Sequence, residues 1–291
     1  MKQFINILAF VGSLSLFMAC EKVKDTGADI DLNGTTHLNA SVEDILIPGA
    51  ETSLWGKGDR IGVFASEAGV NVPWFVKKDG IGASESVFYG EKVKGKLIRA
   101  YYPYVEGLDA TFDAIPCDLA SKQVFEPGIG AVPQFLRYAD RVFAHQENGS
   151  LHFAYPFGML QVEVQLEGAI TVKEMALFSD EALSGRFVVD REEKLSGTSS
   201  SAHSISLMLP AEGVPARLSQ EYSKFLFVLP PRQYERIDLR MSTADGETLE
   251  IRLKDITIPR IENQSFQVAA VSVGISGIPE LNPENGYLEV L

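Results

Sequence analysis

Apolar and polar residues alternate with a period of two along most of this chain. Successive side chains of a β-strand point to opposite faces, so the pattern predicts strands with one buried face and one solvent-exposed face. No window of a dozen residues shows a 3.6-residue period, and we therefore expect helices to be few and short. Many short strands separated by turn residues are typical of sandwiches and barrels. The expected fold class is all-β.

The clearest strand candidates share this alternation and are bounded by clusters of Gly, Pro, Asn and Asp. They are Arg60–Ala65, Lys96–Pro103, Asp140–His145, Met159–Glu167, Thr171–Phe178, Gly185–Asp190, Ser204–Leu209, Lys224–Leu229, Ile237–Thr243, Glu247–Lys254 and Phe266–Val273. Turn residues between them indicate a chain that reverses direction often.

Two of these segments can be aligned residue by residue. Apolar side chains occupy every second position over residues 237–241 and again over residues 249–253. A two-residue turn at 245–246 would place Met241 opposite Glu250, so that apolar and charged side chains would share one face. The alternation therefore disfavours this turn.

A three-residue loop at Ala244–Gly246 removes that conflict. It sets apolar residues against apolar ones and opposite charges against each other, each charged pair being worth about 0.2–1 kcal/mol. Gly246 would adopt the left-handed conformation that the bulge of such a loop requires. The predicted pairs are Met241 with Leu249, Leu239 with Ile251, Ile237 with Leu253, Arg240 with Glu250, and Asp238 with Arg252.

The composition limits the classes of protein that fit. The chain has 291 residues, 45% of them hydrophobic, which supports a large core and excludes intrinsic disorder and a collagen-like repeat. Its 26 Lys and Arg against 39 Asp and Glu give a net charge of −13 without a dense basic stripe. This balance argues against nucleic acid as a partner. Two cysteines are too few for a disulfide framework.

The first twenty residues have the layout of an export signal. Lys2 supplies a positive start, the apolar run Phe4–Phe17 follows, and Ala19 directly precedes Cys20. Residues 1–19 are therefore predicted to be a signal peptide. A cysteine directly after the cut predicts lipidation of Cys20, with acyl groups such as palmitate that hold the mature protein to a membrane surface.

The mature chain is long enough for two domains. Residues 20–36 are polar and rich in Gly, Asp and Thr, so we expect a lipidated flexible tether. The turn-like cluster Gln146–Ser150 divides the remainder. The predicted domains are an N-terminal β-sandwich over residues 37–148 and a C-terminal β-sandwich over residues 149–291.

Residues with catalytic or metal-binding chemistry form no convincing motif. The calcium-loop-like run Asp29–Gly34 has Ala40 where the bidentate Glu should stand. Cys117 has no base that the sequence can assign to it. His145 and His152 could meet across a turn, but two imidazoles without a third ligand make a weak metal site. The other histidines are His37 and His203. We predict no catalytic residue, no metal site, no cofactor and no enzymatic activity.

Two alternatives stay open at this stage. Exposed aromatic side chains could form a platform for sugar rings, and the candidates are Trp55, Trp74, Tyr101, Tyr102 and Tyr104. The 39 acidic residues also leave room for a carboxylate pair of the kind that hydrolyses glycosides. Aromatic residues on the strands of a sandwich are more often part of its core.

One stretch resembles a known family. The run Ser53–Phe64 resembles the W-x-x-G-D-x-I-G-V-F signature of fimbrillin-family (Mfa-like) lipoproteins, and Ala100–Tyr104 is similar to that family's F-x-A-Y-Y-P-Y strand. The likeness continues through Asp140–Ala144 and Leu151–Val164 and is only generic in the last hundred residues. The residues that carry it are Trp55, Gly58, Asp59, Ile61, Gly62, Phe64, Tyr101, Tyr102, Pro103 and Tyr104. We expect these to have a structural role, with Trp55 as a core anchor.

The resemblance implies two transthyretin-like β-sandwich domains in tandem and a role in fimbria (pilus) assembly, anchoring or cell adhesion. It also implies export as a lipoprotein of the outer membrane, exposed at the cell surface. The implied partners are other fimbrial subunits, joined by a donated strand, and a host protein or glycan. A surface lipoprotein that binds glycans through exposed aromatic side chains is the alternative.

The sequence departs from the polymerising members of that family in one respect. Those members lose their N-terminal segment to an arginine-specific protease, but no Arg occurs between Cys20 and Arg60. Arg60 itself opens a predicted core strand. We therefore expect the protein to keep its lipid, as an anchor or accessory subunit would.

Overall fold

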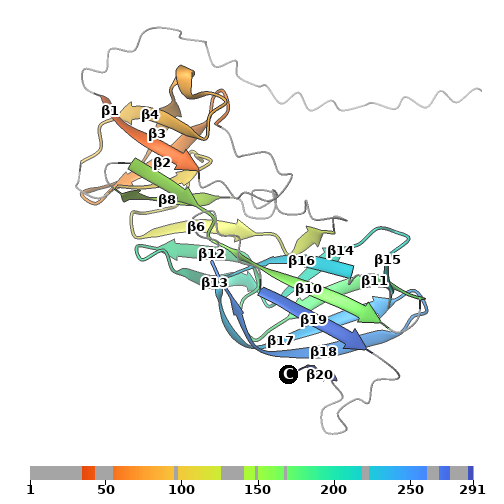
Figure 1. The fold of residues 1–291 in the computed structure, drawn as a ribbon. Helices are drawn as coiled ribbons and strands as arrows, with labels where there is room; N and C mark the ends of the chain where they lie inside the picture. Colours follow the sequence, from red (N-terminus) through yellow and green to blue (C-terminus); the bar gives the residue numbers. More distant parts are fainter. Residues whose placement is uncertain are drawn as a thin grey trace, which may run out of the picture. The chain divides into compact units, whose positions relative to one another are not determined.

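The computed structural model describes residues 35–42, 55–94, 98–125, 141–147, 150–166, 169–217, 223–260, 269–275 and 288–290. Within these ranges the fold is almost entirely β, and the helical structure is a single 3-10 turn at Lys78–Gly80. The expected all-β fold with few short helices is confirmed (Figure 1). The predicted signal peptide and Cys20 lie outside the described residues.

Seven strands form a closed barrel. Their order around it is β1 (Thr35–Val42), β4 (Glu85–Glu91), β3 (Ala68–Val76), β2 (Arg60–Ala65), β5 (Ile98–Tyr102), β8 (Val142–Glu147) and β9 (Ser150–Ala154). A parallel pairing of β1 with β9 closes the sheet, with Asn39 opposite Ser150. The barrel therefore leaves no strand edge free. Its first strand begins at Thr35, inside the segment predicted as a tether.

The other strands form three open sheets (Figure 1). The seven-stranded sheet has the order β20 (Leu288–Val290), β18 (Thr248–Ile258), β17 (Arg232–Thr243), β11 (Ala169–Phe178), β14 (Ser204–Met208) and β7 (Lys122–Val124), and β15 (Val214–Arg217) also pairs with β11. One three-stranded sheet has the order β16 (Ser223–Leu229), β10 (Gly158–Leu166) and β19 (Ala269–Ile275). The second has the order β13 (Leu195–Ala202), β12 (Ser184–Asp190) and β6 (Ala114–Leu119).

Every strand segment predicted from the sequence overlaps an observed strand. The strands that the sequence analysis did not specify are β1, β3, β4, β6, β7, β9, β13, β15 and β20. One of them, β6, contains a residue that disfavours a strand. Pro116 has no N–H for the ladder, but β6 is an edge strand, where proline is tolerated.

Strands that precede the predicted domain boundary pair with strands that follow it. The boundary at 148/149 falls between β8 and β9, which pair with each other in the barrel. Before the boundary, β6 pairs with β12 and β7 pairs with β14. Residues Gly34–Leu291 form one compact unit. A division into two sandwich domains at this point stays a prediction.

The hairpin of β17 and β18 has the predicted register. Met241 lies opposite Leu249, and all five predicted pairs are observed. The loop is closed by a hydrogen bond of 2.9 Å from the Thr243 N–H to the Glu247 carbonyl, and Gly246 has the left-handed φ of +85°. The sequence-based choice of a three-residue loop is confirmed.

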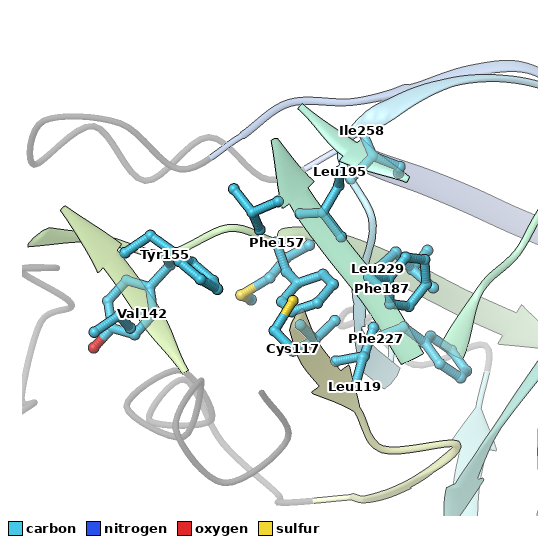
Figure 2. Packing of buried hydrophobic residues seen from close by; sticks show 14 of the residues in the cluster. Cys117, Leu119, Val142, Tyr155, Phe157, Phe187, Leu195, Phe227, Leu229 and Ile258 are labelled. Atoms are coloured by element: carbon cyan, nitrogen blue, oxygen red, sulfur yellow. The ribbon is translucent and has the colours of Figure 1, made fainter. Parts of the chain in front are cut away.

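Buried aromatic and aliphatic side chains connect β6, β12 and β16, as Figure 2 shows for Cys117, Phe187 and Phe227. The rings of Phe157 and Phe187 meet edge to face with their centroids 5.7 Å apart. Cys117 lies directly opposite Phe187 in the ladder and is fully buried. Such burial fits a core side chain rather than a nucleophile open to substrate.

Candidate functional site

The signature residues begin with a tight turn before β2. Gly58 has a φ of +87°, a conformation that favours glycine. Just after it, the Asp59 carboxylate accepts a hydrogen bond of 2.6 Å from the Gly56 N–H and one of 3.1 Å from the Tyr102 hydroxyl. Asp59 therefore ties the turn to the end of β5, and its oxygens are already engaged.

Trp55 is a core side chain with only 2% of its surface exposed. Its ring meets three other aromatic rings edge to face, with centroid distances of 4.8 Å to Phe88, 5.3 Å to Tyr102 and 5.6 Å to Phe153. Its Nε1 is buried without a hydrogen-bond partner. Trp55 thus packs strands of the barrel together, which fits the expected role of a core anchor.

The sugar platform considered from the sequence cannot form around the two tryptophans. Trp74 in β3 is fully buried and donates a hydrogen bond of 3.1 Å from Nε1 to the Glu91 carbonyl. Tyr101 is also fully buried. Because Trp55 is enclosed as well, none of these rings can present a face to a sugar.

The second signature segment packs against the first. Gly62 in β2 lies opposite Tyr101 in β5, and a Cβ at Gly62 would lie 2.0 Å from Cε1 of that ring. The Tyr101 hydroxyl accepts a hydrogen bond of 2.8 Å from the Asn71 side chain. Because a Cβ at position 62 would clash with the ring of Tyr101, glycine is required there.

Burial, together with the nearby Asp59 carboxylate, raises the pKa of Tyr102 to about 12.

The signature residues come together around β2 and the end of β5. Ile61 and Phe64 are buried strand residues. Tyr104, just beyond the cis Tyr102–Pro103 peptide, lies under the guanidinium of Arg60, which is 5.2 Å from the ring centroid. Most of the cluster thus consists of packing and hydrogen bonds within the barrel, whereas Arg60 is exposed at its surface.

The described residues show no cluster of three or more His, Cys, Asp or Glu side chains that could hold a metal ion. His145 and His152 do lie opposite each other in the β8–β9 hairpin, as the sequence suggested. No helix within the described ranges has the length and hydropathy needed to cross a membrane.

A polar groove of about 780 Å³ lies beside β13. Its lining includes hydroxyl groups and ion pairs, namely Thr198, Ser201, Arg260 with Glu193, and Arg232 with Glu181. Both hydroxyls donate hydrogen bonds to the Arg186 carbonyl, so they already have acceptors. These two arginines have carboxylate partners, and Lys194 is a further charged residue of the lining.

The ends of the open sheets are the other candidate surface. In the sheet β16-β10-β19, the β16 end is covered at one point by Gln123 of β7. The Gln123 side-chain amide donates a bond of 2.9 Å to the Val228 carbonyl and accepts one of 2.8 Å from the Val228 N–H. It therefore acts like a short piece of neighbouring strand. At the opposite end, β19 has no further strand beside it among the described residues.

Sequence reasoning missed both Gln123 and the β19 edge. Gln123 belongs to the three-residue strand β7, which is too short for an alternation signal. The β19 segment was predicted as a strand, but its place at the end of a sheet depends on the topology. Neither feature has a local signature.

No protein-family model matches the chain. No curated protein matches it either. Among solved structures it is similar to a proposed cell adhesion protein from Bacteroides ovatus (TM-score 0.46, 17% identity, 76% of this chain and 87% of that chain). It is also similar to the C-terminally truncated tip fimbrial protein Mfa3 from Porphyromonas gingivalis (TM-score 0.40, 14% identity, 80% of this chain and 85% of that chain). A third similar structure is a proposed adhesin from Bacteroides ovatus (TM-score 0.41, 11% identity, 90% of this chain and 96% of that chain). These values are too low for a role to pass from those proteins to this chain.

Proposed function

We propose that this chain is a cell-surface lipoprotein of a fimbria that joins neighbouring subunits by strand pairing. The observation that carries the proposal is the β19 end of the short sheet β16-β10-β19. An end strand presents a row of unpaired N–H and C=O groups, which an extended segment of another chain can complete. A sheet of three strands has room for such an addition.

The signature around Trp55 and Tyr101 supports the same role through its resemblance to fimbrillin-family lipoproteins. An acylated Cys20 would fix the subunit to the outer membrane, and the lack of Arg between Cys20 and Arg60 favours an anchor or accessory subunit that keeps its lipid. In this role the protein binds other proteins and catalyses no reaction.

Two adjacent proline variants, Ser272→Pro and Val273→Pro, test the β19 edge. Along a strand, successive residues direct their backbone groups to opposite neighbours. One variant should therefore lose a backbone hydrogen bond to β10 and unfold at a lower temperature. The other should keep its stability and lose only one N–H donor of the free edge, where the proline ring would also hinder an added strand.

The measurement combines thermal unfolding with electron microscopy of cells whose own gene is deleted and replaced by each variant. We expect the thermally stable proline variant to give shorter, fewer or detached fimbriae, although it reaches the cell surface. If that variant restores fimbriae of normal length, number and attachment, this edge is not used for assembly.

The lipid anchor has its own test. The intact mass of the protein extracted from membranes should correspond to a chain that starts at Cys20 and carries acyl groups. A chain that starts well beyond Cys20 and lacks acyl mass would remove the anchor part of the proposal, and Cys20→Ser should release the protein from the membrane fraction.

A further inference from the structure

Three neighbouring barrel strands carry a row of side chains that points outward. Phe75 in β3 lies opposite Arg60 in β2 on one side and opposite Tyr89 in β4 on the other. Residues that lie directly opposite each other in a ladder share a face. Tyr104 extends the row beyond Arg60. We call these four residues the outer stripe.

Arg60 and Phe75 of the outer stripe are exposed to solvent, and Tyr89 and Tyr104 are half-buried. Phe75 is 39% exposed, while its neighbours Trp74 and Val76 in the same strand are buried. It is the one aromatic residue among the exposed large hydrophobic side chains of the described chain. The centroid of its ring lies 6.2 Å from that of Tyr89, with 32° between the planes, so the two rings are neighbours on this face.

Arg60 adds an available positive charge to this surface. It is exposed, and no carboxylate of the described residues lies within ion-pairing distance of its guanidinium. The adjacent Asp59 carboxylate is held by Gly56 and Tyr102 instead. The ring of Tyr104 supports the guanidinium at 5.2 Å. An unpaired guanidinium of this kind matches the planar, bidentate geometry of a carboxylate.

We propose that the outer stripe binds a sugar ring that carries a carboxylate. The C–H face of the ring would lie on Phe75 and Tyr89, the carboxylate would pair with Arg60, and the hydroxyls of Tyr89 and Tyr104 can exchange hydrogen bonds with sugar hydroxyls. This site lies on the barrel and is independent of the strand edge proposed for assembly.

The size and charge of the stripe favour a sugar over a macromolecular partner. A stable protein interface buries about 800 Å² on each side, which four side chains cannot provide. One cation on a chain with a net charge of −13 is also a poor site for a nucleic acid backbone. A single acidic sugar needs only one cation and one or two rings.

The test uses the mature chain with trigalacturonic acid and with its methyl ester, which has the same rings without the charges. Binding is measured by titration calorimetry and by saturation-transfer NMR. We expect the acid to bind at least about fivefold more tightly than the ester, and the ring protons on the C–H face to receive the strongest saturation.

Two variants separate the stacking contact from the charged contact. Phe75→Ala should weaken both ligands by about tenfold, because both lose the ring contact. Arg60→Gln should bring the acid to the affinity of the ester and leave the ester unchanged. Met208→Ala is the matched control, since Met208 is an exposed hydrophobic residue of β14, outside the barrel.

Three results would overturn the proposal. The acid and the ester could bind equally well, Met208→Ala could weaken binding as much as Phe75→Ala does, or trigalacturonic acid could fail to bind at millimolar concentration. Sedimentation of the free protein supplies a further check. Self-association that Phe75→Ala abolishes would identify the stripe as a contact between copies of the chain.

Discussion

The barrel and the open sheets use the same alternating pattern but end differently. In the barrel, β1 pairs with β9, so each strand has two neighbours. The two three-stranded sheets each keep two end strands, and in the seven-stranded sheet β20, β7 and β15 each pair with only one strand. A closed sheet has no backbone groups to share with another chain, whereas an open sheet does. The proposed strand pairing therefore needs an open sheet, and the proposed sugar site needs only the outer face of the barrel wall.

Both regions have aromatic cores, and buried polar side chains add links between strands. Aromatic rings around Trp55 fill the barrel. Outside it, the rings of Phe157 and Phe187 meet edge to face, and Gln123 hydrogen-bonds to the backbone of Val228. Arg99 of the barrel strand β5 donates hydrogen bonds of 2.6 Å to the carbonyls of Phe112 and of Asp190 in β12, which lies outside the barrel. Burial lowers the pKa of the Arg99 guanidinium. Substitutions of these residues should therefore lower the free energy of unfolding by different amounts.

The largest effect should come from the barrel core. Trp55→Ala removes a buried ring with three aromatic neighbours, and we expect a loss of about 3–5 kcal/mol in the free energy of unfolding. Urea unfolding measures it. Trp55→Phe should cost much less, since it keeps a ring and removes a buried N–H that has no partner. Equal losses for the two variants would contradict the packing account.

Gln123→Met should have the next largest effect. The side chain keeps its approximate size but leaves the N–H and C=O of Val228 without partners, at about 1–3 kcal/mol for each group. Hydrogen exchange at Val228 should also rise. Lys122→Met, at an exposed neighbouring position of β7, is the control and should change little. If both variants behave alike, the amide does not act as a strand neighbour.

The free energy of unfolding, measured against pH, should reveal the ionisation of Tyr102. Its pKa is raised from 10.0 to about 12 in the folded protein, so folding favours the protonated phenol. The stability that this gives is complete below pH 10 and is lost as the pH rises through 12. Tyr102→Phe should flatten the fall in unfolding free energy between these values. An unchanged slope in the variant would show that other groups cause the alkaline loss.

The smallest effects should come from the charged face of the β17–β18 hairpin. The pair of Asp238 with Arg252 is more buried, at 17% and 14% side-chain exposure, than the pair of Arg240 with Glu250, at 51% and 31%. Double-mutant cycles to Ala should give couplings of about 0.2–1 kcal/mol, larger for the first pair. Added salt should weaken the exposed pair more. The opposite order would show that burial does not decide these couplings.

Local pattern predicted much of the fold but little of the candidate sites. The hairpin register was predictable because Met241 and Leu249 are close in sequence and a turn rule connects them. The outer stripe was not, since Phe75 and Arg60 come from strands whose pairing had to be known first. The sequence offers both Tyr104 and Trp55 for a sugar platform, and only the tertiary structure separates the half-buried ring of Tyr104 from the fully enclosed ring of Trp55.

The sequence by itself determined that the chain forms strands, how one hairpin pairs, and which side chains share a face in that hairpin. Alternation acts over a few residues, so it specifies the face of a strand and not its neighbour. The tertiary structure decided which strands meet, as in the closure of the barrel at Asn39 and Ser150 and the contact of Gln123 with Val228. Those pairs lie about a hundred residues apart, and only the packing of the whole core brings them together.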